Sequence, residues 1–270
     1  MKSRWFLSIG ILTVLLAIGL LSGCPATGVD ISGAGTRGDG NVVSQERNAS
    51  NFSGVTLDGI GDVNIYCGEN FKVVVTTDSN LQDILTTNVR GNILYIDQLK
   101  NTNIRNVTKM IIDVHMPELK SFKSDGGGNI EIRNNVAENV NVTLSGIGDI
   151  KIINGKTSNF EIIHSGGGNI DVNNYQAKNV NVTLSGIGDI KFGNGKTSDL
   201  RINHSGGGNI DAQNYEAENA DVTLTGIGDI KIWATKSLKI KHSGGGDILY
   251  KGNPSISDIS ITGVGSIDRL

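Results

Sequence analysis

The sequence predicts an all-β fold, a solenoid of stacked coils about 20 residues long. The main observation is a glycine-rich corner, G-x-G-[DNS]-I, that recurs eight times between residues 126 and 267 at intervals of 18 to 20 residues. Between corners, apolar and polar residues alternate as in β-strands, and no stretch has the period of an amphipathic helix. Equivalent positions of successive coils also match in character, which indicates parallel stacking in register.

Two apolar columns are predicted to face the core. One contains Val142, Ile162, Val182, Ile202, Val222, Ile240 and Ile259, and the other contains Ile130, Ile150, Ile170, Ile190, Ile210, Ile230, Ile248 and Ile267. Residues at these positions share the same strand parity, so they point to the same side of the sheet.

Two outward columns test this register, because parallel coils about 4.8 Å apart would bring like charges together. The signs alternate without exception in one column, which runs Glu131, Lys151, Asp171, Lys191, Asp211, Lys231. Acids alternate with amides in the other, which runs Asn129, Asp149, Asn169, Asp189, Asn209, Asp229 and breaks the rule only at Asp229 and Asp247. A sandwich of hairpins does not explain either column.

The domain is predicted to span residues 51–270. Residues 124–267 form its regular coils, and residues 51–123 form irregular first coils that include a cap, since an end coil must hide its unpaired edge. The corner Gly59-Ile60-Gly61-Asp62 already has the repeat pattern, so the solenoid begins there.

The residues of this block resemble a known family. The stretches "NFSGVTLDGIGDVNIYCGENFKVVVTT" and "MIIDVHMPELKSFKSDGGGNI", followed by the serial corners, are similar to the head GIN domain family of auto-transporter adhesins. The resemblance covers about residues 50–267. It implies a single-stranded, right-handed parallel β-helix, in agreement with the general preference for right-handed crossovers. It also implies adhesion, and it implies no catalytic residues.

The N-terminus predicts export and lipidation. Residues 1–23 have the basic start and short apolar run of a lipoprotein signal peptide, and they end in a lipobox, Leu21-Ser22-Gly23-Cys24. Acylation of Cys24, palmitate included, would anchor the mature chain to the membrane. Residues 24–50 are rich in Gly, Ser and Asn and predict a flexible tether. We expect a protein of the bacterial cell envelope, with the outer membrane as the favoured location.

Charge and cysteine content narrow the function. Loss of the signal peptide leaves 22 of the 24 basic side chains against 27 acidic ones, a net charge of −5. No basic stripe is present, so nucleic acid is not an expected partner. Cys67 has no second cysteine to pair with once Cys24 is acylated, and it is predicted to be a small buried apolar residue.

Three segments resemble ligand-binding motifs but lack a required part of each motif, and no cofactor is expected. Gly33 to Gly38 matches G-x-G-x-x-G without the strand and helix that a dinucleotide site needs. The two "NGKTS" segments, from Asn154 and Asn194, lack the first glycine of a phosphate loop. The 20-residue period does not fit calcium-binding nonapeptides. An ice-binding hydroxyl array is also disfavoured, because only one of its two columns is unbroken.

The histidines recur in one inward column. His164, His204 and His242 alternate with leucines, so successive rings lie about 9.6 Å apart, too far to share one zinc ion. We expect core histidines hydrogen-bonded to backbone or serine, and no metal site. The same coils have Gly167 or Gly207 where their neighbours have Ile147 or Ile187. This pattern suggests a 40-residue unit in which volume removed at one corner is restored by the next coil.

Tyr175 and Tyr215 are the candidate binding residues. They recur two coils apart, with Gly155 and Gly195 at the matching positions of the coils between. If the rings face solvent, they could stack on the sugars of a glycan; alternatively, each ring covers the glycine gap.

These observations favour a non-enzymatic, adhesin-like or structural module, held at the membrane by Cys24, with a glycan or an envelope protein as partner. The alternative is a polysaccharide-acting β-helix enzyme of the lyase or hydrolase type. The alternating charges disfavour it, because catalysis needs an unpaired acid and base gathered in a groove.

Overall fold

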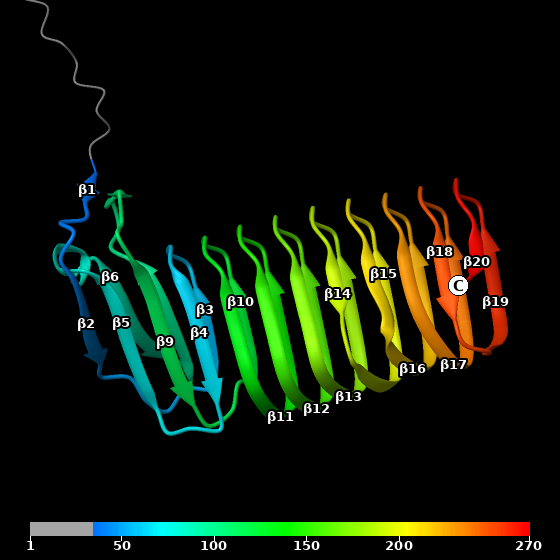
Figure 1. The fold of residues 1–270 in the computed structure, drawn as a ribbon, viewed down its shortest axis with the longest axis horizontal. Coiled ribbons are helices and arrows are strands. Elements are labelled where there is room, and N and C mark those ends of the chain that lie inside the picture. Colours follow the sequence, from blue (N-terminus) through cyan, green and yellow to red (C-terminus); the bar gives the residue numbers. More distant parts are fainter. Residues whose placement is uncertain (1–34) are drawn as a thin grey trace, which may run out of the picture. The chain divides into compact units, whose positions relative to one another are not determined.

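The computed structural model describes residues 35–270, so the signal peptide and the lipidation motif at Cys24 lie outside the described residues. The described chain is a β-solenoid of parallel coils stacked along one axis, which confirms the predicted fold class (Figure 1). None of its helices has the length and apolar character that a bilayer crossing requires.

Each regular coil runs from one glycine corner to the next and pairs with the coils on either side. The longest strands bend midway, so one strand contributes to both faces of the stack. The strands of this part are β10 (Ser121–Ser124), β11 (Ile130–Leu144), β12 (Ile150–His164), β13 (Ile170–Leu184), β14 (Ile190–Phe192), β15 (Gly195–His204), β16 (Ile210–Leu224), β17 (Ile230–His242), β18 (Ile248–Lys251), β19 (Ser255–Ile261) and β20 (Ile267–Arg269).

The predicted register is confirmed over the whole repeat. Ile130 pairs with Ile150, and the same column continues to Ile267. Val142 pairs with Ile162, and its column continues to Ile259. Within the inner coils these side chains are 0 to 2 % exposed. The apolar layers of successive coils therefore form one continuous core.

The corners require glycine because neighbouring backbones come into contact there. Gly188 has a φ of +144°, and a Cβ on it would lie 1.8 Å from the carbonyl oxygen of Gly168 in the preceding coil. An L-residue is disfavoured both by that φ and by that contact. This close approach lets the corners stack at the same spacing as the strands.

The N-terminal block is a coil with a long insertion. Its first coil comprises β3 (Gly54–Leu57) and β4 (Asp62–Cys67), which pair with β10 and β11. The insertion contains β5 (Lys72–Asp78), a 3-10 turn (Ser79–Leu81), β6 (Leu85–Arg90), β7 (Ile93–Gln98), β8 (Ile104–Arg105) and β9 (Met110–Met116). β7 stacks in parallel on β3, and β9 stacks in parallel on β4. β6 then pairs antiparallel with β7, and β5 pairs antiparallel with β9. These strands cover the N-terminal end of the stacked coils and are here called the cap.

The predicted tether, residues 24–50, is wrong over its second half. β1 (Thr36–Arg37) pairs with β8, and β2 (Val42–Arg47) pairs antiparallel with β5. The Gln82 side chain donates from Nε2 to the carbonyl oxygen of Val43 at 2.8 Å, which fixes β2 further. Edge strands of this kind are held by backbone pairing, so their polar composition resembles that of a linker.

Candidate functional site

Of the two alternatives for Tyr175 and Tyr215, the structure has the one in which each ring covers a glycine gap, which removes the basis for glycan stacking on them. Tyr175 is 1 % exposed and Tyr215 0 %. A Cβ on Gly155 would lie 2.1 Å from the Tyr175 ring, and one on Gly195 would lie 2.4 Å from the Tyr215 ring. The rings therefore fill the space that glycine leaves in the preceding coil, and burial raises the pKa of both phenols.

The inward orientation has a local cause at Tyr175. Asn174 has a φ of +52°, and this left-handed residue shifts the alternation so that the odd-numbered Tyr175 points inward. The Tyr175 ring stacks on Phe160 with centroids 4.5 Å apart, and the Tyr215 ring packs on Phe192 at 5.0 Å. Both phenylalanines belong to the preceding coil, so each pair ties two coils together.

The histidines are core residues, as predicted. His164, His204 and His242 are 0 to 1 % exposed. Each places Nε2 2.7 or 2.8 Å from the carbonyl oxygen of the last glycine in its own corner, so Nε2–H donates to it. Among residues 35–270, no group of three or more His, Cys, Asp and Glu side chains could hold a metal ion.

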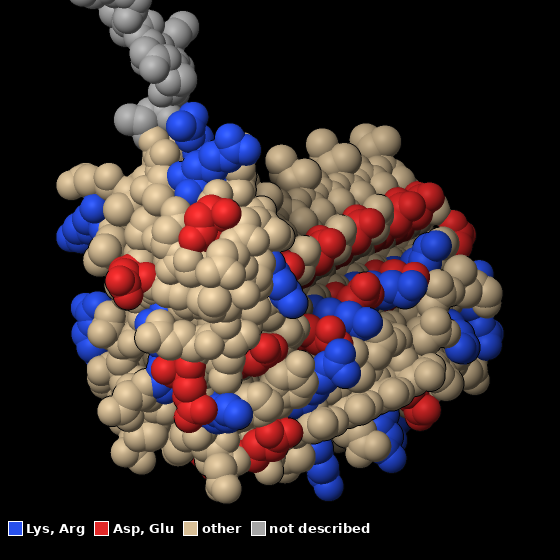
Figure 2. Space-filling model, turned by 60° about the vertical axis from the view of Figure 1, so that its left-hand side comes forward, with Lys and Arg blue, Asp and Glu red and all other residues tan. Residues whose placement is uncertain are grey.

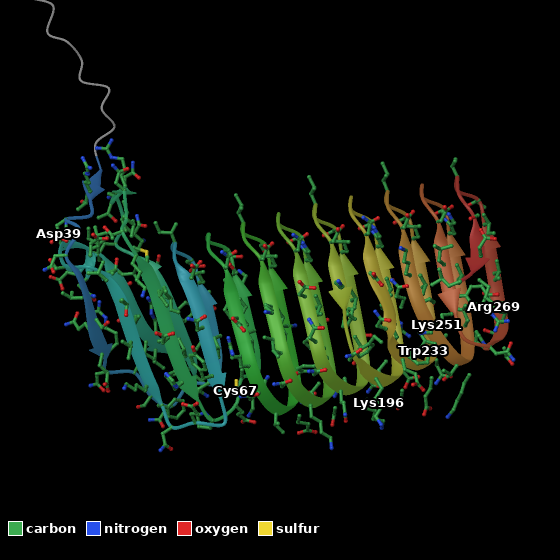
Figure 3. The ribbon with its side chains drawn as sticks, in the orientation of Figure 1. Asp39, Cys67, Lys196, Trp233, Lys251 and Arg269 are labelled. Carbon is green, nitrogen blue, oxygen red and sulfur yellow. The ribbon has the colours of Figure 1, made fainter. Side chains whose placement is uncertain are left out.

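Cys67 lies at the end of β4, inside the first coil (Figure 3). It is 4 % exposed, and burial raises the pKa of its thiol to about 12. The thiolate that reactive cysteines need is therefore disfavoured, and the predicted role as a small buried residue is confirmed.

One outward column forms a continuous hydrogen-bond ladder, here called the Asx ladder. In each step, a backbone N–H donates to the side-chain oxygen of the equivalent residue in the preceding coil, at 2.7 to 3.2 Å. Its members are Asp62, Asn129, Asp149, Asn169, Asp189, Asn209, Asp229, Asp247 and Ser266. At its end, hydrogen bonds from Ser266 hold the pKa of Asp247 below its ordinary value. In this column, Asn and Asp supply the side-chain oxygen that accepts the hydrogen bond, and the Asn residues also separate the negative charges of successive coils.

The charged column that runs from Glu131 to Lys231 has the predicted register, but its lysines do not form close ion pairs with its acids. Lys151 pairs with Glu131 and Asp171 through the backbone, yet within residues 35–270 no carboxylate oxygen lies within 4.0 Å of the Lys151, Lys191 or Lys231 ammonium group. Alternation therefore reduces repulsion between coils without fixing the side chains. Figure 2 shows the acidic rows and the mixed row running side by side along the stack.

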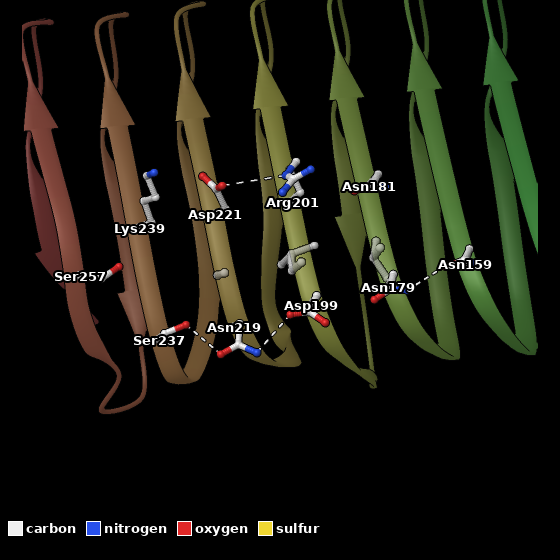
Figure 4. Close-up of a pocket in the computed structure, with 13 residues that line it drawn as sticks. Asn159, Asn179, Asn181, Asp199, Arg201, Asn219, Asp221, Ser237, Lys239 and Ser257 are labelled. Atoms are coloured by element: carbon white, nitrogen blue, oxygen red, sulfur yellow. Dashed lines mark hydrogen bonds and ion pairs between the residues drawn. The ribbon is translucent and has the colours of Figure 1, made fainter.

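A second surface, here called the amide groove, lies on the β12–β17 face and has a volume of about 530 Å³. One wall is a row of hydrogen-bonded polar side chains. Asn179 donates to Asn159 at 2.7 Å, Asn219 donates to Asp199 at 3.1 Å, and Ser237 donates to Asn219 at 2.8 Å (Figure 4). The row continues the bond from Asn159 to Asn139, at 2.7 Å.

The other wall of the amide groove comes from residues two positions further along the strands. It contains Asn181, Arg201, Asp221 and Lys239, and Arg201 Nε lies 3.9 Å from Asp221 Oδ2. The Arg201 side chain is 63 % exposed, so its remaining donors face solvent (Figure 4). The groove thus offers amide, carboxylate and guanidinium groups at the coil spacing of about 4.8 Å, a donor and acceptor set suited to a hydroxyl-rich ligand.

Positions 139, 159, 179, 199 and 219 are Asn except for Asp199, and this recurrence every 20 residues is a signal that could have found the groove. Uncharged outward residues form neither an apolar column nor an alternation of charge, so these two patterns do not indicate the groove. The hydrogen bonds within the row depend on side-chain geometry, which the pattern alone does not fix.

The middle residue of each corner lies outside the core. Ile147 is 76 % exposed and Ile187 is 78 % exposed, while Gly167 stands between them in the stack. The predicted exchange of core volume between Gly167 and these isoleucines is therefore wrong. The exchange occurs instead at the opposite bend, between Gly155 and Tyr175.

The fold and grooves are those of an elongated solenoid with a polar, repetitive surface. The family model described as "Putative auto-transporter adhesin, head GIN domain" matches residues 51–254. The chain belongs to this family, and the resemblance seen in the sequence is confirmed.

Solved structures share the fold. A protein from Parabacteroides merdae described as a "putative adhesin" has a TM-score of 0.78 at 19 % identity, with 87 % of this chain and 98 % of that chain covered. One from Parabacteroides distasonis described as a "Putative lipid binding protein" has a TM-score of 0.72 at 28 % identity, covering 88 % and 100 %. Another "putative adhesin" from Parabacteroides distasonis has a TM-score of 0.77 at 22 % identity, covering 88 % and 100 %. No match was found among curated proteins.

Proposed function

We propose that the protein is a non-enzymatic, adhesin-like module of the bacterial cell envelope, lipid-anchored through Cys24, that binds a glycan along the amide groove. The observation that carries the proposal is the in-register row of amides and carboxylates, which presents equivalent groups at every coil. A polymer with repeating hydroxyl groups suits such a row, because each coil can make a similar hydrogen bond. The family description and the adhesin descriptions of similar structures support an envelope location.

The geometry of the groove favours binding over catalysis. Asp199 accepts a hydrogen bond from Asn219, and Asp221 lies beside Arg201, so each carboxylate already has a partner. An acid–base enzyme would need a carboxyl group positioned free at the reacting bond. The polysaccharide-acting enzyme is therefore the less favoured function.

Glycan-array binding of the mature chain tests the groove. We expect binding to a neutral or weakly charged polysaccharide, and about a tenfold or greater loss in Asn179→Ala/Asn219→Ala, since each lost hydrogen bond contributes about 0.5–1.5 kcal/mol. Gln176→Ala removes another exposed amide, outside the groove, and should leave binding unchanged. Thermal unfolding verifies that all variants fold. Equal binding by the double variant, or no polysaccharide binding by the parent, would show that the groove is not the site.

Metabolic labelling tests the anchor and the location. A palmitate analogue should label the full-length protein in cells and should not label Cys24→Ser. Protease treatment of intact cells then distinguishes surface display from a periplasmic position. An unlabelled parent protein in the soluble fraction would exclude the anchor.

A further inference from the structure

The edge formed by the glycine corners carries a row of exposed apolar side chains, here called the apolar row. Backbone bridges align nine corner residues in one line, in which Ile60, Ile147, Ile187, Ile227 and Val264 alternate with four glycines. The side chains of Ile147, Ile187, Ile227 and Val264 are 75 to 83 % exposed, and that of Ile60 is 40 % exposed. Neighbouring members lie about 9.6 Å apart along the stack.

Packing within the fold does not explain why this row is apolar. A Cβ on Gly167, Gly207 or Gly245 would meet no atom within 4 Å, so side chains at this position extend into open space. All nine positions are nevertheless Gly, Ile or Val, and none is charged or polar. A regular line of exposed apolar groups is the surface property that marks an interaction site.

The chain enters the domain at this same edge. β7 runs parallel to β3 toward the first corner, and β9 runs parallel to β4 away from it, so the link between β7 and β9 crosses at the corner edge. β8 lies in that link and pairs with β1. Figure 1 shows β1 on the side toward which the corners project.

Basic residues surround this entry point, in a group here called the basic cluster. Arg37, Lys100, Arg105 and Lys109 are all exposed, and no carboxylate oxygen of the part of the chain that the structure describes lies within 4.0 Å of any of the four. Figure 2 shows Lys and Arg gathered where the described chain begins. Cations beside apolar tips are the combination that binds a phospholipid surface, with the cations at phosphate groups and the apolar groups at the acyl boundary.

We infer that the apolar row and the basic cluster dock on the lipid bilayer to which the chain is anchored. This inference rests on the proposed anchor at Cys24. Ten residues lie between Cys24 and Gly35, so the chain between these two residues reaches at most about 40 Å. Tethering raises the effective concentration of the edge at the membrane, so that a weak contact suffices.

Docking by this edge determines the orientation of the solenoid and of the amide groove relative to the membrane. The solenoid axis would lie along the membrane, because the row follows that axis. Asn181, in the amide groove, is six residues from Ile187, about 20 Å along the strand. The groove thus remains in solvent. The ladder carboxylates that flank the row add negative charge beside it, so we expect a preference for a zwitterionic surface over a strongly anionic one.

Tryptophan quenching on vesicles tests the docking. The mature chain, residues 25–270, carries a hexahistidine tag in place of acylated Cys24 and is attached to phosphatidylcholine vesicles through a nickel-chelating lipid. Ile187→Trp reports on the apolar row. Val136→Trp is the matched control, because Val136 is an exposed apolar residue, 66 % accessible, at the other bend of the coil. Fluorescence of the parent, from Trp233, is subtracted.

We expect lipids with brominated acyl chains to quench Ile187→Trp and to leave Val136→Trp unchanged. We also expect Ile147→Ser/Ile187→Ser/Ile227→Ser to lower vesicle binding of the untagged mature chain by about tenfold or more. Equal quenching at both positions, or none at either, would overturn the inference. So would concentration-dependent self-association that the triple variant abolishes, since the row would then bind a second copy. The tag replaces the anchor, so failure of acylation in cells is a separate result.

Discussion

At the N-terminal end of the solenoid, antiparallel strands cover the last apolar layer, whereas at the C-terminal end that layer contacts solvent. Leu81, at the end of the 3-10 turn, and Leu85, the first residue of β6, are 0 and 4 % exposed. In the last coil, Ile256, Ile259 and Ile261 are 42 to 48 % exposed, although they continue columns that are buried one coil earlier.

The difference shows that the apolar layer of a coil is buried only where another coil or the cap covers it on each side. The same side chains are core residues in one layer and surface residues in the next, as expected where each repeat contacts only its neighbours. Two features protect the open edge from pairing with other chains: a register shift between β17 and β19, and the charge of Asp258.

The largest expected effect comes from the corners. Gly188→Ala should destabilise the protein by about 4 kcal/mol or more, because the Cβ would meet the Gly168 carbonyl and the φ is left-handed. Gly265→Ala has a similar φ, +145°, and a Cβ 1.9 Å from the Gly246 oxygen, but only the last coil must move to relieve it. Urea unfolding followed by circular dichroism compares the two. Equal losses would mean that the ends are not independent.

A smaller contrast is expected within one apolar column. Ile240→Ala should cost about 2–5 kcal/mol, since the side chain is fully buried. Ile259→Ala, one coil later, should cost about 1 kcal/mol or less. The same unfolding measurement applies, and a large loss at Ile259 would indicate that the end is covered in solution.

The cap should respond to acid through Asp78. Although desolvation raises its pKa, hydrogen bonds from Thr108 and the Gly40 N–H outweigh this and hold the pKa of the carboxyl below its ordinary value. Its contribution to stability is therefore full above the unfolded-state pKa and is lost as the pH falls through the lower folded-state pKa. Unfolding of the cap followed from pH 6 to pH 2 should show this loss in the parent. In Asp78→Asn, the loss of cap stability between pH 6 and pH 2 should be smaller than in the parent. An equal loss would mean that other groups cause it.

The smallest expected effect concerns the Asx ladder. Asn169→Ala removes the acceptor of the Asp189 N–H and should cost about 1 kcal/mol. Asn203→Ala is the control, because Asn203 is an exposed Asn outside the ladder and should be near neutral. Unfolding midpoints measured side by side compare the two variants. Matching midpoints would show that the ladder bonds add nothing to stability.

The regular coils could be predicted from sequence because two independent columns constrain their register. A slip of one residue would have turned Ile170 outward and the charged Asp171 inward, so few alternatives remained. The bend at Asn174 was not predictable in this way. One left-handed residue reverses the alternation, and no pattern shows in advance which Asn adopts that conformation.

The surface was less predictable than the core. Ile147 was interpreted as a packing residue because apolar residues elsewhere in the coil face inward, yet the corner turns it into solvent. The residues of β2 resemble a linker, because an antiparallel edge strand is held by backbone pairing and needs few apolar residues. The amide groove shows as a repeated Asn, but its hydrogen bonds require the coil spacing and the side-chain orientations together.

Hydrogen–deuterium exchange, read by mass spectrometry along the described chain, tests the contrast between the two ends most directly. Amides of β13 and of the cap strand β9 should exchange slowly, while those of β19 and β20 should exchange through local opening of the last coil, orders of magnitude faster. Protection of β19 equal to that of β13 would contradict the account, because it would mean that the C-terminal layer is covered.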